Sequence, residues 1–285
     1  MTTIGDPTHQ LFAPALGLEP GRGRLVGRNI LILGAGQRAN DDPAAMGNGR
    51  AMSLLFAREG AAVACADLDT ASAGETVQLV QAEGGRAIAL AADARDPESA
   101  ARVFEAAEAA LGRISGAVAN VGIANGRNLS NESAPTWDDV MAVNVRAHML
   151  LLQQGLEHMP AGSAILLISS LASTSPAGRN PAYETSKAAL AALCRAGALE
   201  GQKSGIRVNA IAPGLLDTPM GRAASARSPS RAARPLPFAR QGTAWELAYT
   251  ALFLLSHESS YVNAQTLFMD GGLGSGVAIA ATPSA

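Results

Sequence analysis

The feature that most constrains the fold is a regular alternation between short apolar runs and longer amphipathic segments. The apolar runs predict strands at Asn29–Leu33, Ala62–Ala66, Ala87–Ala91, Gly116–Ala119, Ala164–Ile168, Arg207–Ile211 and Thr266–Met269. The amphipathic segments predict helices near Gly49–Glu59, Ala71–Glu83, Pro97–Leu111, Thr136–Met159, Tyr183–Lys203 and Ala244–Ser256. Continuous apolar strands are buried on both faces, and helical connections give right-handed crossovers and a parallel sheet. We therefore predict an α/β fold, a single doubly wound domain with about seven parallel strands and helices on both faces.

The same pattern sets the expected domain organisation. It runs unbroken from residue 29 to about residue 272, so no second domain is predicted. Residues 1–24 contain many glycines and prolines and are expected to form an extended or loosely packed N-terminal arm. Residues 25–273 would form the domain, and residues 274–285 a C-terminal tail.

Composition argues against several classes of function. The chain has 285 residues, a net charge of −2 and a pI near 6.1, which gives no reason to expect a nucleic-acid partner. No apolar run reaches the roughly 18–20 residues of a membrane span, and no signal peptide is recognisable. We therefore expect a cytoplasmic protein that makes no membrane contact.

The cysteines and histidines point to no metal. Cys65 and Cys194 are far apart in the sequence, and each lies in an apolar stretch, as expected of buried free thiols in a reducing compartment. The four histidines form no pattern of metal ligands.

The first predicted strand ends in a turn with two glycines, Gly34 and Gly36. In a Rossmann-type sheet this turn is where the pyrophosphate of a dinucleotide meets helix N–H groups. Two registers compete. In one, residues 34–39 match G-x-G-x-x-G/A and the helix follows at once, but Pro43 would interrupt that helix. In the other, which we favour, the helix starts at Gly47-Asn48-Gly49.

In the favoured register, residues Gln37–Met46 form an insertion between the turn and the helix. The simplest interpretation is a solvated surface loop. The alternative is a flap that brings Arg38 to the phosphates, or that places Asp41 and Asp42 against a neighbouring subunit.

The second predicted strand ends beside Asp67. An acid at this place accepts hydrogen bonds from the ribose hydroxyls of adenosine and repels a 2′-phosphate, and no Arg or Lys follows to offset that repulsion. The sequence therefore favours NAD(H), with NADP(H) as the less favoured cofactor. The structural alternative is that Asp67 or Asp69 caps the next helix.

Tyr183 and Lys187 are the candidates for the chemistry. Positions i and i+4 share one face of a helix, so the Lys187 ammonium can lie beside the Tyr183 phenol. A nearby cation favours a phenolate, and a group tuned toward the working pH is an effective acid or base. Ser170, which follows the strand predicted at Ala164–Ile168, could hold a substrate oxygen. Taken alone, the pair would also suit a surface helix with an exposed lysine.

Taken together and in order, these motifs resemble those of the short-chain dehydrogenase/reductase family over roughly residues 25–273. The resemblance rests on Gly34 with Gly47-Asn48-Gly49, Asp93-Ala94, Ala119-Asn120-Val121-Gly122, Asn144, Ser170, Tyr183, Lys187, Pro213-Gly214-Leu215-Leu216-Asp217-Thr218 and Asp270-Gly271-Gly272. It implies catalytic roles for Asn144, Ser170, Tyr183 and Lys187. It implies cofactor contacts from Gly34, Gly36, Gly47, Asn48, Gly49, Asp67, Leu68, Asp93, Ala94, Asn120, Gly122, Tyr183, Lys187, Pro213, Gly214, Leu216 and Thr218.

The chain departs from the family pattern at three places. Leu33 stands where a Thr usually precedes the first glycine, and Ala119 stands where an Asn is common. The insertion makes the glycine turn longer than in the family. The Thr and the Asn normally tie the turn to the sheet, so their replacement puts the local hydrogen bonding in question.

The resemblance implies hydride transfer between NAD(H) and a secondary alcohol or ketone, with Tyr183 as acid/base and Lys187 and Ser170 assisting. One alternative is an NADPH-dependent reductase of 3-oxoacyl or polyketide intermediates. Another is a dinucleotide-binding regulator with little turnover.

The resemblance also implies a lid and an assembly. In the family the segment after Thr218 covers the substrate, here residues 219–240, and five arginines between Thr218 and Trp245 would suit an anionic substrate. A mobile, solvated lid is the alternative interpretation of that segment. Family members pair through the helices expected here at Thr136–Met159 and Tyr183–Lys203, so a homodimer or homotetramer is expected.

Overall fold

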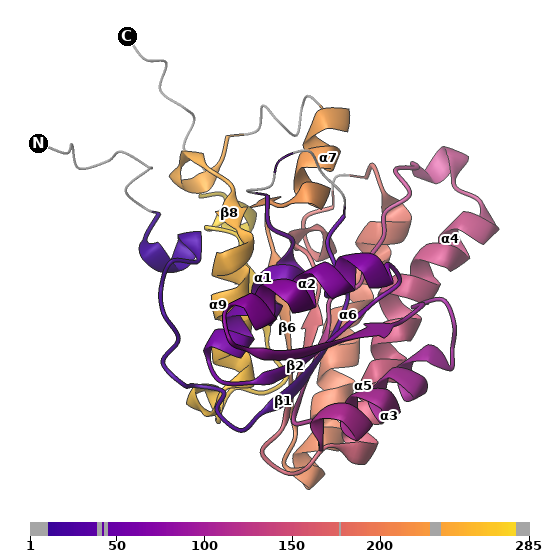
Figure 1. Ribbon diagram of the computed structural model, residues 1–285. Coiled ribbons are helices and arrows are strands. Elements are labelled where there is room, and N and C mark those ends of the chain that lie inside the picture. The colour runs from indigo at the N-terminus through magenta and orange to yellow at the C-terminus, as the bar shows by residue number, and fades with distance from the viewer. Residues whose placement is uncertain (1–10, 39–41, 43–44, 177, 229–234, 278–285) are drawn as a thin grey trace, which may run out of the picture.

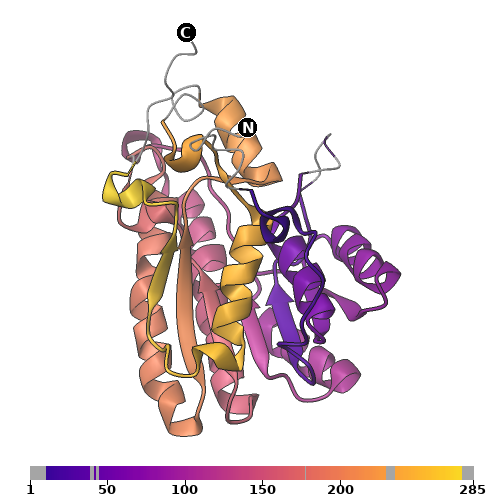
Figure 2. The same ribbon diagram turned by 90° about the vertical axis from the view of Figure 1, so that its left-hand side faces the viewer.

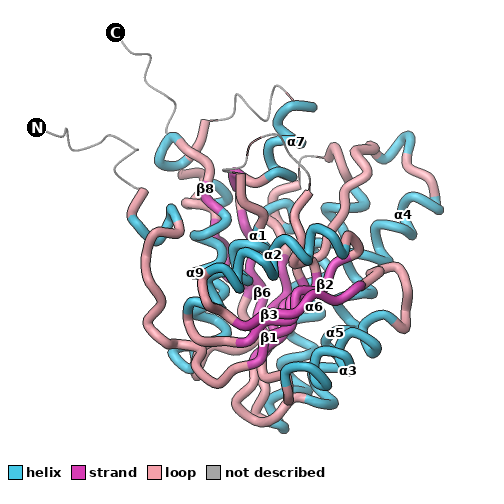
Figure 3. The backbone as a smooth tube through the Cα atoms, viewed as in Figure 1, coloured by secondary structure: helices cyan, strands magenta, loops and turns pink. Residues whose placement is uncertain are grey.

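A computed structural model describes residues 11–38, 42, 45–176, 178–228 and 235–277. Its centre is a seven-stranded sheet in the order β3-β2-β1-β4-β5-β6-β9, and every neighbouring pair is parallel (Figures 1 and 3). The strands are β1 (Asn29–Leu33), β2 (Ala62–Asp67), β3 (Arg86–Ala91), β4 (Gly116–Ala119), β5 (Ala164–Ile168), β6 (Arg207–Pro213) and β9 (Thr266–Met269). The predicted doubly wound α/β fold is confirmed.

Helices cover both faces of this sheet. The helices of the described chain are α1 (Asn48–Arg58), α2 (Thr70–Ala82), α3 (Ser99–Leu111), α4 (Ala134–Met141), α5 (Ala147–His158), α6 (Pro181–Gly201), α7 (Pro219–Arg227) and α9 (Ala244–Leu255), of which α7 does not lie on a face of this sheet. Because successive side chains of a strand point to opposite faces, Ile30 and Ile32 join a core with α1, α2 and α9. Leu31 and Leu33 join a second core with α3, α5 and α6.

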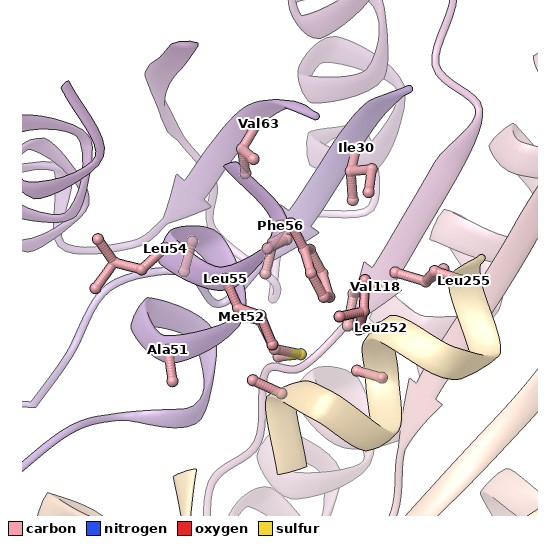
Figure 4. Packing of buried hydrophobic residues seen from close by; sticks show 14 of the residues in the cluster. Ile30, Ala51, Met52, Leu54, Leu55, Phe56, Val63, Val118, Leu252 and Leu255 are labelled. Atoms are coloured by element: carbon pink, nitrogen blue, oxygen red, sulfur yellow. The ribbon is translucent and has the colours of Figure 1, made fainter. Parts of the chain in front are cut away.

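Helices α1 and α9 share an extensive apolar interface. Met52, Leu55 and Phe56 of α1 meet Leu252 and Leu255 of α9 in one buried cluster (Figure 4). Each such side chain contributes roughly 1.5–3 kcal/mol when it is fully buried. This cluster fixes α1, and with it the helix start that the sequence places at the dinucleotide turn.

The structure divides one predicted helix into three parts. The segment predicted as one helix at Thr136–Met159 consists of α4, a π-helical turn at Ala142–Arg146 and α5. Apolar periodicity does not reveal such a turn, because the helix axis continues through it. π-Helical turns occur frequently at functional sites, and Asn144 lies inside this one.

The segment after β6 contains elements that the sequence pattern does not predict. A two-stranded parallel ladder joins β7 (Leu216–Asp217) to β8 (Gly242–Thr243), and α7 lies between them in the chain. Figure 2 shows α7 beyond the end of the main sheet. Pro219 at the first helical position and the Thr218 side chain, which accepts a hydrogen bond from Gly221 N, start α7.

Residues 11–28 pack along α1 and α9. The fully buried Glu59 carboxylate accepts hydrogen bonds from the backbone N–H groups of Arg22 (3.0 Å) and Arg24 (2.9 Å) and from the Arg24 guanidinium. The Arg58 guanidinium donates to the Gly17 carbonyl at 2.7 Å and lies 4.9 Å from the Trp245 ring centroid. Residues 1–10 of the predicted arm and 278–285 of the predicted tail lie outside the described residues.

In the described part of the chain, no helix is long and apolar enough to cross a membrane. The same residues contain no group of three or more His, Cys, Asp or Glu side chains arranged to hold a metal ion. Cys65 and Cys194 are buried free thiols, as predicted.

Candidate active site

The first turn brings the carboxyl end of β1 against the start of α1. Gly34 has φ = +92°, a conformation that L side chains rarely adopt. A Cβ on Gly49 would collide with the Gly34 carbonyl oxygen. Helix α1 begins at Asn48 with Gly47 as its N-cap, so the second of the two sequence registers is the observed one.

Asn120 ties this turn to the sheet. Its side-chain amide donates to the Gly34 carbonyl at 2.7 Å, and its backbone N–H donates to the Leu33 carbonyl at 2.9 Å. This answers the question raised by Leu33 and Ala119, because the residue after Ala119 supplies the connection.

Asp67 lies at the carboxyl end of β2 and faces the turn. Its carboxylate accepts from Gly36 N at 2.8 Å and from Asp69 N at 3.1 Å. The cap of α2 is Asp69, whose side chain accepts from Ser72 N. Asp67 is therefore not the helix cap, and its carboxylate remains half-buried at the place where an adenosine ribose binds in this fold.

Arg50, a basic residue of the first turn of α1, is directed toward α2, at the residues Ser72 and Thr76 that bind the turn. Its guanidinium is buried on α2, where it donates to Thr76 Oγ1 (3.0 Å), Ser72 O (3.2 Å) and Glu75 Oε2 (2.9 Å). It is thus committed to joining α1 to α2.

The turn fits a dinucleotide by two structural tests. The first-turn N–H groups of α1, at Asn48, Gly49 and Arg50, are the orphan donors of a helix N-terminus, which attracts anions. Asn48 Oδ1 is buried and has no hydrogen-bond partner within the described residues. Glycine at positions 34 and 49 lets the turn pack closely against Val121 and against the start of α1, because a Cβ at either position would collide with the backbone there.

Lys187 and Tyr183 lie on α6 with the geometry that their spacing predicts. Lys187 is only 3% exposed, and its ammonium donates to the Ile168 carbonyl at 2.8 Å. The same nitrogen lies 5.8 Å from the centroid of the Tyr183 ring. Burial lowers the pKa of Lys187 from 10.5 to about 7. Because Lys187 is buried, the alternative of a surface helix with an exposed lysine is wrong.

Asn144 lies in the π-helical turn and faces the same centre. It is fully buried, accepts from Ile123 N at 2.8 Å, and donates to Ile123 O and to Ser186 Oγ, both at 2.9 Å. A Cβ on Gly122 would lie 3.2 Å from Lys187 Nζ and 3.7 Å from Asn144 Oδ1. Gly122, Asn144 and Lys187 therefore converge.

Ser170 follows β5, and its Oγ accepts from Ala172 N at 3.2 Å as the cap of a short 3-10 turn, Leu171–Ser173. That turn packs against α6. The neighbouring Ser169 Oγ donates to the Lys187 carbonyl at 2.8 Å, which fixes the strand end to the helix that carries Tyr183.

Pro213 ends β6, and the following residues form the far side of the site. Gly214 N donates to Met269 O at 3.0 Å, and a Cβ on Gly214 would lie 2.7 Å from that of Asp270. Leu216 is buried in β7, and Thr218 caps α7. The segment that the resemblance assigns to the nicotinamide is thus held against the start of the D-G-G motif.

The remaining predicted cofactor residues lie at the rim near β2 and β3. Asp93 follows β3 and accepts from Arg95 N at 2.9 Å, Ala94 packs at the edge of the second core, and Leu68 is 62% exposed.

His148 is the site residue that the sequence argument missed. It is fully buried on α5, and within the described residues neither ring nitrogen makes a hydrogen bond of ordinary geometry. Burial and the nearby Lys187 charge hold the pKa of His148 well below its usual value, while the carbonyls of Val143 and Ala119 act in the opposite direction. Its position four residues after Asn144 was the available signal.

Two of the five arginines expected to favour an anionic substrate are engaged within the chain. Arg222 pairs with Asp42 and Asp217, and Arg240 pairs with Glu246. Arg227 is exposed at the end of α7, and Arg231 and Arg234 lie outside the described residues.

The chain is similar to known proteins over most of its length. The model of the family described as enoyl-(acyl carrier protein) reductase matches residues 44–274. Among curated relatives, the 3-oxoacyl-[acyl-carrier-protein] reductase FabG of Thermotoga maritima is 32% identical over 252 residues, 88% of this chain and 99% of that protein. The 3beta-hydroxysteroid dehydrogenase 1 of Eggerthella lenta is 33% identical over 257 residues, 87% of this chain and 94% of that protein.

Solved structures give the same result. A dehydrogenase/reductase from Sinorhizobium meliloti superposes with a TM-score of 0.79 at 30% identity, covering 87% of this chain and 95% of that one. Enzymes of this kind act on hydroxyl or keto groups and use NAD or NADP as cofactor. The chain described here belongs to the short-chain dehydrogenase/reductase family.

Proposed function

We propose that the protein transfers a hydride between NAD(H) and a secondary alcohol or ketone. The observation that carries this proposal is the burial of Lys187 beside Tyr183, at the end of the sheet where the first turn offers free N–H groups. A buried ammonium is costly to maintain, which argues for a functional reason for its position.

Each residue has a role in the proposed reaction. Tyr183 takes the proton of the substrate hydroxyl during oxidation and returns it during reduction. Ser170 holds the substrate oxygen and stabilises the charge that develops on it. Lys187 holds Tyr183 and a ribose hydroxyl in place. Asn144 holds the surrounding backbone and side chains in place through its hydrogen bonds to Ile123 and Ser186. When bound, the nicotinamide supplies or accepts the hydride.

The cofactor preference follows from Asp67 and Arg50. The Asp67 carboxylate repels a 2′-phosphate, and the Arg50 guanidinium, which could have offset that repulsion, is bound to α2. Both observations support NAD(H). The first turn would hold the pyrophosphate through the N–H groups of α1, with Asp67 on the adenosine ribose.

A second candidate is an NADPH-dependent reductase of 3-oxoacyl thioesters. The observation that favours it is the name of the Thermotoga maritima relative, 3-oxoacyl-[acyl-carrier-protein] reductase. An anionic or thioester substrate would meet Arg227, while Arg222 and Arg240 are already paired.

The proposal also includes association of the cytoplasmic protein into a homodimer or homotetramer. Its support is a shallow groove between α4, α5 and α6, whose apolar lining of Met141, Ala142, Val145, Met149 and Leu193 is flanked by Asp138 and Arg146. Sedimentation of the purified protein would measure this directly.

A cofactor titration by fluorescence, NADH against NADPH, is the decisive first experiment. Tighter NADH binding, followed by oxidation of a secondary alcohol with NAD⁺, is the expected result. Tighter NADPH binding would favour the second candidate. Binding of either cofactor without turnover over a broad alcohol and ketone panel would indicate a regulator, and binding of neither would refute the enzyme proposal.

A further inference from the structure

His148 is a buried titratable residue to which the proposed reaction gives no role. It lies on α5, one helical turn after Asn144, and its side chain is fully buried. Neither ring nitrogen has a hydrogen-bond partner within the described residues. Buried polar atoms are nearly always paired, with protein groups or with ordered water. A purely structural role does not explain this imidazole, because an apolar side chain of similar size would fill the space without burying two polar atoms.

The surroundings place His148 beside Lys187. The Ala119 carbonyl at the carboxyl end of β4 and the Val143 carbonyl in the π-helical turn both lie close to the imidazole. Gly122 follows in the same segment as Ala119, and a Cβ on Gly122 would lie 3.2 Å from Lys187 Nζ. Helices α5 and α6 pack together on this side of the sheet. The imidazole and the ammonium therefore meet at the carboxyl end of β4.

The hydrogen-bonding capacities of these two side chains are complementary. A neutral imidazole has one N–H donor and one nitrogen lone pair. Either neighbouring carbonyl can take the N–H of His148, so the lone pair is the atom that needs a donor. An ammonium has three N–H donors, and the Lys187 ammonium has one acceptor within the described residues, the Ile168 carbonyl at 2.8 Å. Since the two side chains make no direct hydrogen bond, one water between them would satisfy both.

The protonation states agree with this arrangement. Burial and the Lys187 charge hold the pKa of His148 well below its usual value, so the imidazole is neutral and its lone pair is available. Burial lowers the pKa of Lys187 to about 7. A further fall of one unit would leave only about a tenth of the Lys187 side chains charged at neutral pH. A single hydrogen-bond acceptor therefore decides how often Lys187 carries its charge.

Other titratable groups around the pair do not take over this part. On α6 the Glu184 carboxylate accepts from Gly178 N at 3.2 Å, and burial raises the pKa of the Cys194 thiol to about 11. Strands β4 and β5 carry no titratable side chain. The titratable side chains of α3 and α4 are half-buried or exposed, and in the described chain Lys187 is the charged group that acts on His148.

We propose that His148 is a positioning residue: its neutral ring accepts a hydrogen bond, through one buried water, from the Lys187 ammonium and so keeps that ammonium charged beside Tyr183. A charged Lys187 favours the phenolate that takes the substrate proton. His148 acts through Lys187 and does not itself exchange that proton. The effect on Tyr183 rests on the proposed function, whereas the contact with Lys187 does not.

An NMR titration reads the charge of Lys187 directly, because the chain contains two lysines, Lys187 and Lys203. The protein is labelled with ¹³C at the lysine Cε, and the exposed Lys203 serves as the internal reference. His148→Leu removes both ring nitrogens at similar size. It should lower the pKa of Lys187 by about one to two units, the effect of losing one hydrogen bond to a charged group. His148→Gln keeps a donor and an acceptor and should recover most of that shift.

Leu152→Val is the matched control. Leu152 is buried on the same helix, but its side chain lies against Gly197 of α6. This variant should unfold at a lower temperature while the Lys187 titration stays as in the wild type. An unchanged pKa of Lys187 in His148→Leu would overturn the proposal, and so would a raised one, since the imidazole would then repel the ammonium. If His148→Leu does not fold, His148→Phe, which has a flat ring without nitrogens, replaces it.

The pH profile of alcohol oxidation tests the effect on Tyr183. In His148→Leu the acidic limb of kcat/KM should move toward higher pH by roughly one unit, because a neutral Lys187 no longer favours the phenolate. His148→Gln and Leu152→Val should keep the limb near its wild-type position. A limb that stayed in place while the pKa of Lys187 fell would reject the link to Tyr183.

The two measurements separate this proposal from the proposed function. If the wild type oxidised no alcohol and reduced no ketone, the proposed function would fail. The NMR titration would still decide whether His148 keeps Lys187 charged.

Discussion

The ammonium nitrogen of Lys187 lies 5.8 Å from the centroid of the Tyr183 ring, one helical turn away on α6, and donates to the Ile168 carbonyl at 2.8 Å. The carboxyl end of β5 thereby fixes the position of the Lys187 side chain, and the Lys187 ammonium lies beside the Tyr183 ring. Sequence spacing predicts only that the two side chains share a helix face. The position of β5 decides that the shared face is buried.

Replacement of Tyr183 by Phe should reduce turnover by roughly 10²–10⁴-fold, because the phenol oxygen that exchanges the proton is lost. The affinity for NADH should change little. Steady-state kinetics and a fluorescence titration on the same preparation measure both. The matched control is Tyr249→Phe, on α9, whose hydroxyl is buried without a partner within the described residues. Equal loss of activity in both variants would argue against a catalytic Tyr183.

Lys187→Met should change how stability depends on pH. The unfolded chain keeps the Lys187 proton up to about 10.5, whereas burial lowers the folded pKa to about 7. Unfolding therefore takes up a proton between these values, so wild-type stability rises with pH across this window. The rise is on the order of 1 kcal/mol per pH unit.

The variant lacks this titration, so its advantage in unfolding free energy over the wild type should be largest below pH 7 and shrink toward pH 10. Denaturant unfolding at several pH values between these limits makes the comparison. Parallel stability curves for the two proteins would show that Lys187 is not desolvated.

Gly49→Ala should disrupt the dinucleotide turn, because the added Cβ would collide with the Gly34 carbonyl and push α1 away from β1. We expect NADH binding to weaken at least tenfold, together with a stability loss of about 1–3 kcal/mol. Gly74→Ala is the matched control, because a Cβ at this helical position of α2 meets nothing within 4 Å. It should stabilise the protein by roughly 0.5–1 kcal/mol. Isothermal titration and thermal unfolding separate the two effects.

Glu59→Gln should loosen residues 11–28 from the body of the domain. The Glu59 carboxylate is fully buried and accepts four hydrogen bonds from Arg22 and Arg24. Removing its charge should cost about 2–3 kcal/mol at neutral pH. Glu19→Gln, which removes only the exposed pair with Arg22, should stay within about 0.5 kcal/mol of the wild type.

The acid dependence of Glu59 has a defined sign. Burial raises the pKa of this carboxyl, but the hydrogen bonds from Arg24 and Arg22 outweigh burial and leave the pKa below 4.5. Its stabilising contribution is therefore complete above pH 4.5 and is lost as the pH falls through the folded pKa. The difference in unfolding free energy between wild type and Glu59→Gln should shrink on acidification, and a difference that grew would contradict this account.

Much of the fold follows from local pattern alone. The apolar runs place β1, β4, β5 and β9 at their observed bounds. For the central strands β1, β4 and β5 the reason is that strands buried on both faces have to be continuously apolar, whereas β9 lies at the edge of the sheet and is only partly buried, contrary to the expectation that every strand is buried on both faces. The choice of Gly47 as the start of α1 also follows from the sequence, since Pro43 excludes the other register. The spacing of Tyr183 and Lys187 predicts that they share a helix face, because the period of an α-helix is fixed.

Tertiary structure alone decides how distant segments meet. Asn120 replaces the usual tie of the turn to the sheet, His148 is buried near Lys187, and Asp42 pairs with Arg222. The spacing of His148 from Asn144 indicates a shared helix face but not its burial near Lys187, and the other two contacts have no local signature. Each contact depends on strand order and on the packing of helices that are far apart in the chain. The sequence determined which chemical groups stand at the ends of the strands. The packing of those strands and helices decided which of the groups are buried, paired or left open to a ligand.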